Sequence, residues 1–107
     1  MHGGYCMAMT TTNEREAATQ LARRLVEARL AACVQILDVR SVFTWQGSVD
    51  DAAECLLLIK TRCDLYERLE SFIREHHSYD VPEILRVPIA GGFGPYLSWM
   101  DESTSSG

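Results

Sequence analysis

The segment from Ala31 to Thr61 reads AACVQILDVRSVFTWQGSVDDAAECLLLIKT, and the rest of the architecture is arranged around it. It contains three strand-like stretches, residues 31–37, 39–46 and 53–61. Asp38 interrupts the first two stretches, and the polar residues of 47–51 predict a turn before the third. Neighbouring strands joined by a short polar connection predict an antiparallel hairpin.

A helical pattern lies on each side of this hairpin. Upstream, apolar side chains recur at helical spacing across residues 14–30, and Asn13 with Glu16 predicts a capping box at the start of that helix. Downstream, Asp64 is predicted to cap a second helix, which ends near residue 77. Each helix is therefore expected to bury one apolar face.

Two further strands flank the helices. Residues 5–12 predict the first strand and residues 84–89 the last, with Pro88 favouring an edge position in the sheet. Pro95 suits the first turn of a short final helix over residues 96–102. The element order is β-α-β-β-α-β plus a terminal helix, which predicts an α+β fold of the ferredoxin-like sandwich type.

The length and composition bound the domain count and the partners. The 107 residues suffice for one domain, spanning 1–107, and the small or polar ends, 1–4 and 103–107, are expected to fray. The net charge is −5, Lys60 is the only lysine, and Arg23-Arg24 is the only basic doublet, which disfavours a nucleic-acid partner. No apolar run approaches the roughly 20 residues that cross a bilayer, so membrane insertion is not expected.

The hairpin strands are apolar on both faces. Seven large apolar residues contribute to this pattern: Val42, Phe43, Trp45, Leu56, Leu57, Leu58 and Ile59. Continuous apolar strands are typical of sheets that are buried on both sides. Two helices on one side of a sheet leave the other side open, so the pattern predicts a homo-oligomer.

The four cysteines, Cys6, Cys33, Cys55 and Cys63, form no C-x-x-C pair and lie in or beside apolar runs. Buried cysteine behaves as a small apolar side chain. The pattern, together with the lack of a secretory signal in the first residues, predicts reduced, structural thiols in a cytoplasmic protein.

Five strings in register carry a family resemblance. They are LAACVQI at 30–36, FTWQG at 43–47, the strand 54–61, HSYDVPEI at 77–84 and YLSW at 96–99. Together they resemble the CutA family of divalent-cation tolerance proteins, from about Tyr5 to Asp101. The resemblance implies a tight homotrimer of ferredoxin-like subunits, a cytoplasmic location, a link to copper and other divalent metals, and no catalytic activity.

The resemblance also implies a metal site. Family members proposed to bind copper use a cysteine at the end of the first strand and a His-His pair after the second helix. This chain has the pair as His76-His77 and has Met9 at the cysteine position. Methionine is a soft ligand that suits Cu(I), so copper is the expected cofactor with Met9, His76 and His77 as its ligands. Cys6 is expected on the opposite face of that strand from Met9.

A second hypothesis is a ligand pocket between subunits. It would be lined by one aromatic wall and paired charges: Trp45, Glu54, Lys60, Tyr79 and Glu83. Such a pocket would make the protein a trimeric signalling or scaffolding module, similar in architecture to PII proteins, for a small ligand or protein partner. An enzyme is not expected, because the sequence contains no nucleophile elbow, phosphate loop or dinucleotide motif.

Overall fold

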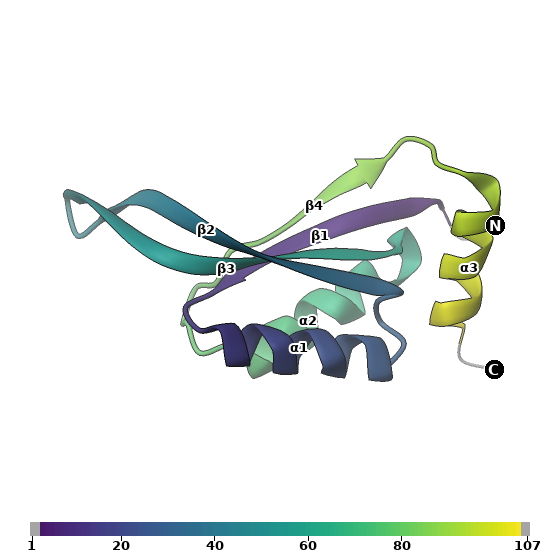
Figure 1. The fold of residues 1–107 in the computed structure, drawn as a ribbon, viewed down its shortest axis with the longest axis horizontal. Helices are drawn as coiled ribbons and strands as arrows, with labels where there is room; N and C mark the ends of the chain where they lie inside the picture. The colour runs from purple at the N-terminus through teal and green to yellow at the C-terminus, as the bar shows by residue number, and fades with distance from the viewer. Residues whose placement is uncertain (1–2, 106–107) are drawn as a thin grey trace.

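The computed structural model describes residues 3–105. Its elements follow in the order β1 (Tyr5–Thr12), α1 (Arg15–Glu27), β2 (Cys33–Trp45), β3 (Ser48–Arg62), the 3-10 turn η1 (Cys63–Leu65), α2 (Tyr66–His76), β4 (Ile84–Ile89) and α3 (Gly94–Thr104). The four strands form one antiparallel sheet in the order β2-β3-β1-β4. Helices α1 and α2 cover one face of this sheet, and α3 lies at its end (Figure 1). The expected ferredoxin-like α+β fold is confirmed.

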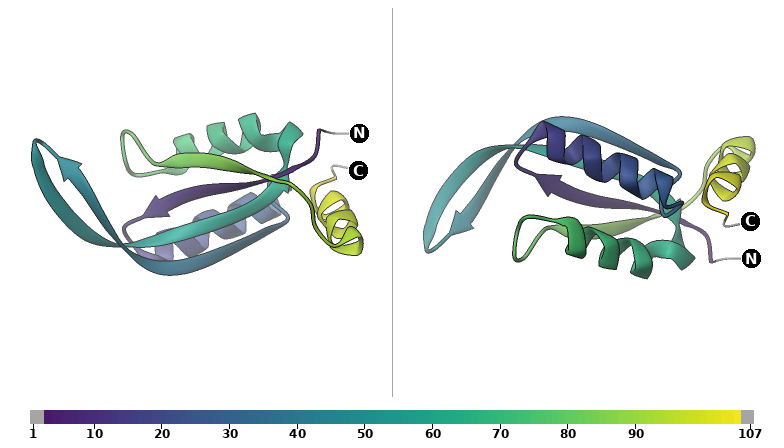
Figure 2. Two further views of the ribbon diagram at one scale, coloured as in Figure 1. Left: turned by 90° about the horizontal axis from the view of Figure 1, so that it is seen from above. Right: turned by 90° about the horizontal axis from the view of Figure 1, so that it is seen from below.

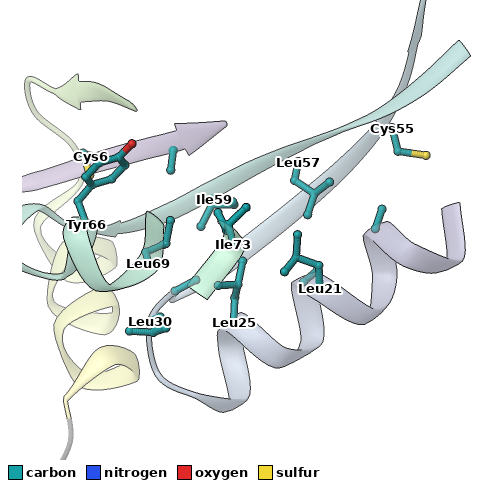
Figure 3. Packing of buried hydrophobic residues seen from close by; sticks show 14 residues of the cluster. Cys6, Leu21, Leu25, Leu30, Cys55, Leu57, Ile59, Tyr66, Leu69 and Ile73 are labelled. Atoms are coloured by element: carbon teal, nitrogen blue, oxygen red, sulfur yellow. The ribbon is translucent and has the colours of Figure 1, made fainter. Parts of the chain in front are cut away.

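The core fills the space between the two helices and the covered face of the sheet (Figure 3). Its centre is made by five fully buried side chains from three elements: Leu25, Leu57, Ile59, Leu69 and Ile73. Burying each such side chain stabilises the fold by about 1.5–3 kcal/mol. The helical spacing of the leucines therefore gives α1 and α2 their positions on the sheet.

The hairpin differs from its prediction in two places. Asp38 does not interrupt the strand, because it pairs in register with Cys55 and β2 continues to Trp45. The turn is only two residues long, Gln46 and Gly47, with φ of 50° and 83°. Two left-handed residues form the turn whose twist matches that of the flanking strands. The polar residues after Gly47 therefore enter β3 and do not form a longer turn.

The distal part of the hairpin extends beyond the rest of the sheet. β1 ends at Thr12, opposite Cys55 on β3, so residues 39–45 and 48–54 pair only with each other. Figures 1 and 2 show this two-stranded ribbon projecting away from the helices. We call residues 39–54 the distal ribbon.

The starts of both helices differ from prediction. α2 begins at Tyr66 with Leu65 as its N-cap, so the prediction that Asp64 caps it is wrong, because Asp64 lies within the preceding turn η1.

The N-cap of α1 is Glu14, which makes no side-chain cap, so the predicted Asn13–Glu16 capping box is wrong. Instead, the Thr12 hydroxyl donates to the Glu14 carbonyl over 3.0 Å. The helix ends at Glu27, two residues before Arg29 takes a left-handed φ of 59°.

Both ends of the described chain are held by hydrogen bonds, and the Tyr5 hydroxyl of β1 donates to Asp101 Oδ2 of α3 over 2.8 Å. The Cys63 amide donates to the Gly4 carbonyl, and α3 extends two residues past its predicted end to Thr104. The Thr104 hydroxyl is buried and donates to the Met100 carbonyl, so the prediction of fraying was wrong for Ser103 and Thr104. Of the other residues expected to fray, 1–2 and 106–107 lie outside the described residues. Pro88 lies on the edge strand β4, as predicted.

Candidate functional site

The sheet face opposite α1 and α2 is largely apolar, and within the described chain α3 reaches it at one end, where the Tyr5 hydroxyl donates to Asp101. Side chains alternate between the two faces of a strand, and paired residues share a face. Met9 lies opposite Leu58 on β3 and Leu85 on β4, which places all three on this open face. Its apolar members include Met7, Met9, Leu37, Leu56, Leu58, Leu85, Val87 and Ile89.

The distal ribbon continues this exposed apolar surface. By register, Phe43 (39% exposed) and Trp45 (59% exposed) lie on the side of the open face, whereas Val42 (68% exposed) and Val49 (79% exposed) lie on the other side of the ribbon. Exposed large apolar side chains gathered on one element mark an interaction site in soluble proteins. The open face and the distal ribbon are therefore the surfaces that an assembly would cover.

His76 is the last residue of α2 and keeps one ring nitrogen open. Its Nδ1 lies 2.8 Å from the Phe72 carbonyl, and the two rings stack with centroids 4.1 Å apart. A carbonyl only accepts, so Nδ1 donates, and Nε2 of the neutral ring keeps its lone pair. The exposed His76 therefore has the form of a monodentate metal ligand.

Both ring nitrogens of His77 make hydrogen bonds within the subunit. The Tyr79 amide donates to Nδ1 over 3.1 Å, and Nε2 lies 2.6 Å from the Thr11 carbonyl. An amide only donates and a carbonyl only accepts, so His77 is a neutral imidazole that carries its proton on Nε2. His77 thereby links the segment after α2 to the end of β1. A metal could bind His77 only after one of these bonds breaks.

The three predicted ligands do not meet within one subunit. Met9 points away from the helices, whereas the His76 ring packs on Phe72 of α2, in the helical layer. α2 ends at His76, and the backbone of His77 is extended. The two histidines could bind one metal only if the helix ends between them, and this condition is met. Within residues 3–105, no group of three or more His, Cys, Asp or Glu side chains is placed to hold a metal ion.

Two of the five predicted pocket residues contact each other. The Tyr79 hydroxyl donates to Glu54 Oε2 over 3.0 Å, and its ring packs against that of His77 at 4.7 Å. Burial and the Glu54 carboxylate raise the pKa of Tyr79. The contact attaches the segment after α2 to the base of the distal ribbon.

The other three pocket residues lie apart in one subunit. Lys60 shares a strand with Glu54 but lies six residues further on, roughly 20 Å away at the usual rise of a strand. Its Nζ donates to Gln35 Oε1 over 2.6 Å. Trp45 lies at the tip of the distal ribbon, and Glu83 is exposed just before β4. A common pocket would therefore need residues from more than one copy.

The sequence missed one cluster of titratable side chains. The register of β1 on β3 and the hydrogen bond from the Cys63 amide to the Gly4 carbonyl place Cys63 diagonally across from Cys6. Tyr66 and Arg86 complete the cluster, and burial, then the Cys63 thiol, raises the pKa of Cys6 to about 11. Figure 3 shows Cys6 beside the Tyr66 ring. The signal was non-local: Cys6 pairs with Thr61, two residues before Cys63, so only the register of β1 on β3 reveals the neighbours. We call these four residues the thiol cluster.

No helix in the described part of the chain has the length and hydropathy needed to span a membrane.

Comparison with known proteins identifies relatives along nearly the whole chain. Residues 6–103 match the family described as "CutA1 divalent ion tolerance protein". The chain is 45% identical over 95 residues to "Protein CutA, chloroplastic" of Arabidopsis thaliana, a match that covers 88% of this chain and 52% of the relative. It is 41% identical over 99 residues to the "Divalent-cation tolerance protein CutA" of Thermus thermophilus, a match that covers 92% of this chain and 96% of the relative. The chain thus spans about half the length of the plant relative.

A solved structure shares the fold. The "Periplasmic divalent cation tolerance protein CutA" from Archaeoglobus fulgidus superposes with a TM-score of 0.92 at 34% identity, covering 94% of this chain and 99% of that one. Sequence and fold thus agree over the same elements, from β1 to α3. The chain belongs to the CutA1 divalent ion tolerance family.

Proposed function

We propose that this protein acts in divalent-cation tolerance as a non-enzymatic homotrimer that binds divalent metal or copper ions. The family and the printed names of its relatives support the tolerance role. The observation that carries the assembly is the uncovered apolar surface formed by the open face and the distal ribbon. Exposing this surface to water costs about 25 cal/mol for each Å² of apolar area, which association recovers.

The distal ribbon is suited to reach a neighbouring copy. It has no third strand of its own, and both of its edges are free to pair within residues 3–105. In the proposed trimer, each ribbon lies across the open face of the next subunit. In a closed ring of three subunits, every open face is covered by a ribbon and every ribbon is used.

The proposed metal ligands then come from different copies. Met9 lies on the open face, which the assembly covers, and His76 offers Nε2 at the end of α2. His77 joins the ligand set only by giving up a hydrogen bond to Thr11 or Tyr79. Copper accepts both thioether and imidazole ligands, so the donor types suit this ion.

Light scattering and copper titration test the two halves of the proposal separately. We expect a particle of three times the 12.0 kDa chain mass at micromolar concentration. Copper affinity should fall in the His76→Ala/His77→Ala double variant, with His2 and the cysteines unchanged. A 12.0 kDa particle contradicts the trimer, and undiminished affinity in the double variant removes the histidine ligands.

Two further expectations remain predictions. A cytoplasmic location is expected from the cysteine pattern and the family resemblance, whereas the names of two relatives place them in the chloroplast and the periplasm. The PII-like alternative needs Trp45, Lys60 and Glu83 to join the Tyr79–Glu54 pair across subunits. A calorimetric screen of small anions and nucleotides against the trimer would distinguish it from a protein that binds only metals.

A further inference from the structure

The two long edges of the distal ribbon differ in charge and in their free backbone groups. β1 ends opposite Cys55, so β3 has no neighbouring strand on its outer side along residues 48–54. Figures 1 and 2 show this part of the ribbon projecting beyond the helices. We call this outer side of residues 48–54 the β3 edge. A strand edge without a neighbour is a template on which another strand can pair.

The register shows which amides point outward at the β3 edge. The Ala32 amide donates to the Lys60 carbonyl over 2.8 Å, so the backbone groups of Lys60 face β2. Backbone groups alternate in direction along a strand, and the register of β2 on β3 is continuous. The amides of Val49, Asp51 and Ala53 therefore point away from β2, where β1 no longer provides acceptors for them.

The side chain of Asp50 occupies the central one of these three amides. Its Oδ1 accepts a hydrogen bond from the Asp51 amide over 2.8 Å. This bond uses the donor that an incoming strand would need at the middle of the edge. Asp50 and Asp51 are both exposed, and neither forms an ion pair among residues 3–105. The β3 edge therefore carries two uncompensated negative charges.

Pairing of this edge with the same edge of a second copy brings carboxylates together. In an antiparallel pair centred on residue 50, Asp50 faces Asp50 of the other copy, and in a pair centred on residue 51, Asp51 faces Asp51. In a pair centred on residue 52, Asp50 faces Glu54. Like charges directly opposite each other destabilise strand pairing. The β2 edge of the ribbon differs, because Arg40 is the only charged residue within 39–45.

We propose that Asp50 and Asp51 prevent the β3 edge from pairing with the same edge of another copy. Without these two residues, the ribbons of two particles would join side by side, and the outward amides of each would find acceptors on the other. The inference goes beyond the proposed function, because it needs no metal. Its test uses the wild-type particle as the reference, whether that particle contains one chain or three.

Light scattering of charge variants tests the inference. Asp50→Asn/Asp51→Asn removes both charges and keeps a side-chain oxygen that can accept from the amide of residue 51. Asp50→Ala/Asp51→Ala removes the charges and the hydrogen bond. The matched control is Glu16→Gln/Glu27→Gln, which removes two charges from exposed positions of α1, so each of the three variants changes the net charge from −5 to −3.

Both aspartate variants are expected to form particles of at least twice the wild-type mass, while the control keeps the wild-type mass. The alanine variant should associate at about 10-fold lower concentration than the asparagine variant, because its outward amide is free to pair. Equal association of the two overturns the role of the Asp50–Asp51 hydrogen bond and supports that of the charges. Wild-type mass in both aspartate variants, or equal association of the control, overturns the inference.

Hydrogen exchange locates the contact. In the wild-type protein the amides of Val49 and Ala53 should exchange rapidly, and in the associated aspartate variants they should be protected by at least about 10-fold. Association that leaves these amides unprotected overturns the inference, as does protection of both amides in the wild-type protein, which would mean that the edge is already occupied. Circular dichroism confirms that each variant is folded, as expected for residues outside the core.

Discussion

The two faces of the central sheet contain similar residues in different surroundings. Leu57 and Leu58 are neighbours on β3, yet Leu57 is 0% exposed beneath the helices and Leu58 is half-buried on the open face. On β2, Leu37 of the open face is 43% exposed, while Ile36 packs against the core. Apolar composition therefore predicts that a sheet face is buried, but it does not predict whether the same chain or another copy buries it.

The same difference separates stability from assembly. Contacts on the covered face hold one subunit together, whereas the open face and the distal ribbon are available to another copy. The residues that set the fold and those that set the oligomeric state thus alternate along one strand. Substitutions at adjacent positions can test the two roles independently.

The largest expected effect comes from the pair Leu57→Ala and Leu58→Ala. Leu57→Ala leaves a cavity in the core and should lower the free energy of unfolding by about 2–5 kcal/mol. Leu58→Ala should chiefly weaken assembly, seen as dissociation at a higher protein concentration. Urea unfolding at fixed concentration, combined with light scattering, measures both effects.

Equal unfolding losses with unchanged assembly in both variants would contradict this separation of faces.

His77→Ala should have the next largest effect. It removes the partner of both the Thr11 carbonyl and the Tyr79 amide, and leaving such groups unpaired costs about 1–3 kcal/mol. His77→Asn supplies an acceptor near Nδ1 and His77→Gln a donor near Nε2, so each should restore part of the loss. Urea unfolding of the three variants measures the difference.

Identical losses in all three variants would show that the hydrogen bonds of the ring do not stabilise the segment after α2.

Tyr79→Phe tests the attachment of this segment to the distal ribbon. It removes the hydrogen bond to Glu54 and should lower the free energy of unfolding by about 0.5–1.5 kcal/mol. In a double-mutant cycle with Glu54→Gln, the two losses should not add, because both variants disturb one contact. Additive losses would mean that the contact contributes nothing.

The smallest effect, and the only stabilising one, is expected at Thr10. Its buried hydroxyl has no hydrogen-bond partner among the described residues, so Thr10→Val should raise the free energy of unfolding by up to about 1 kcal/mol. Thr61 is the matched control, since it is equally buried and donates to the Leu30 carbonyl over 2.7 Å. Thr61→Val should therefore destabilise the protein, and a thermal melt of both variants shows whether the signs differ.

Most of the fold could be predicted because its signals are local. The helical spacing of apolar residues predicted α1 and α2, and Pro88 predicted the edge position of β4. One of the misses has a local signal that strand pairing overrides, and the other depends on which of two adjacent residues begins a helix. Asp38 is polar but pairs with Cys55 within a long hairpin, and Asn13 precedes a helix whose cap is Glu14.

The candidate site was harder to predict because it depends on register. Adjacent histidines in the sequence suggested a shared metal, but His77 uses both nitrogens within the subunit, and His76 stacks on Phe72. Cys6 and Cys63 are far apart in the sequence and become neighbours only through the pairing of β1 with β3. Residue types alone do not contain that information.

The central position of β1 affects how the protein is made. β1 is synthesised before both of its hydrogen-bonded neighbours, β3 and β4. A nascent or truncated chain that lacks residues 84–89 leaves one side of β1 unpaired, and unpaired strand edges promote aggregation. Synthesis of this protein therefore depends on protecting its first strand until the last strand emerges.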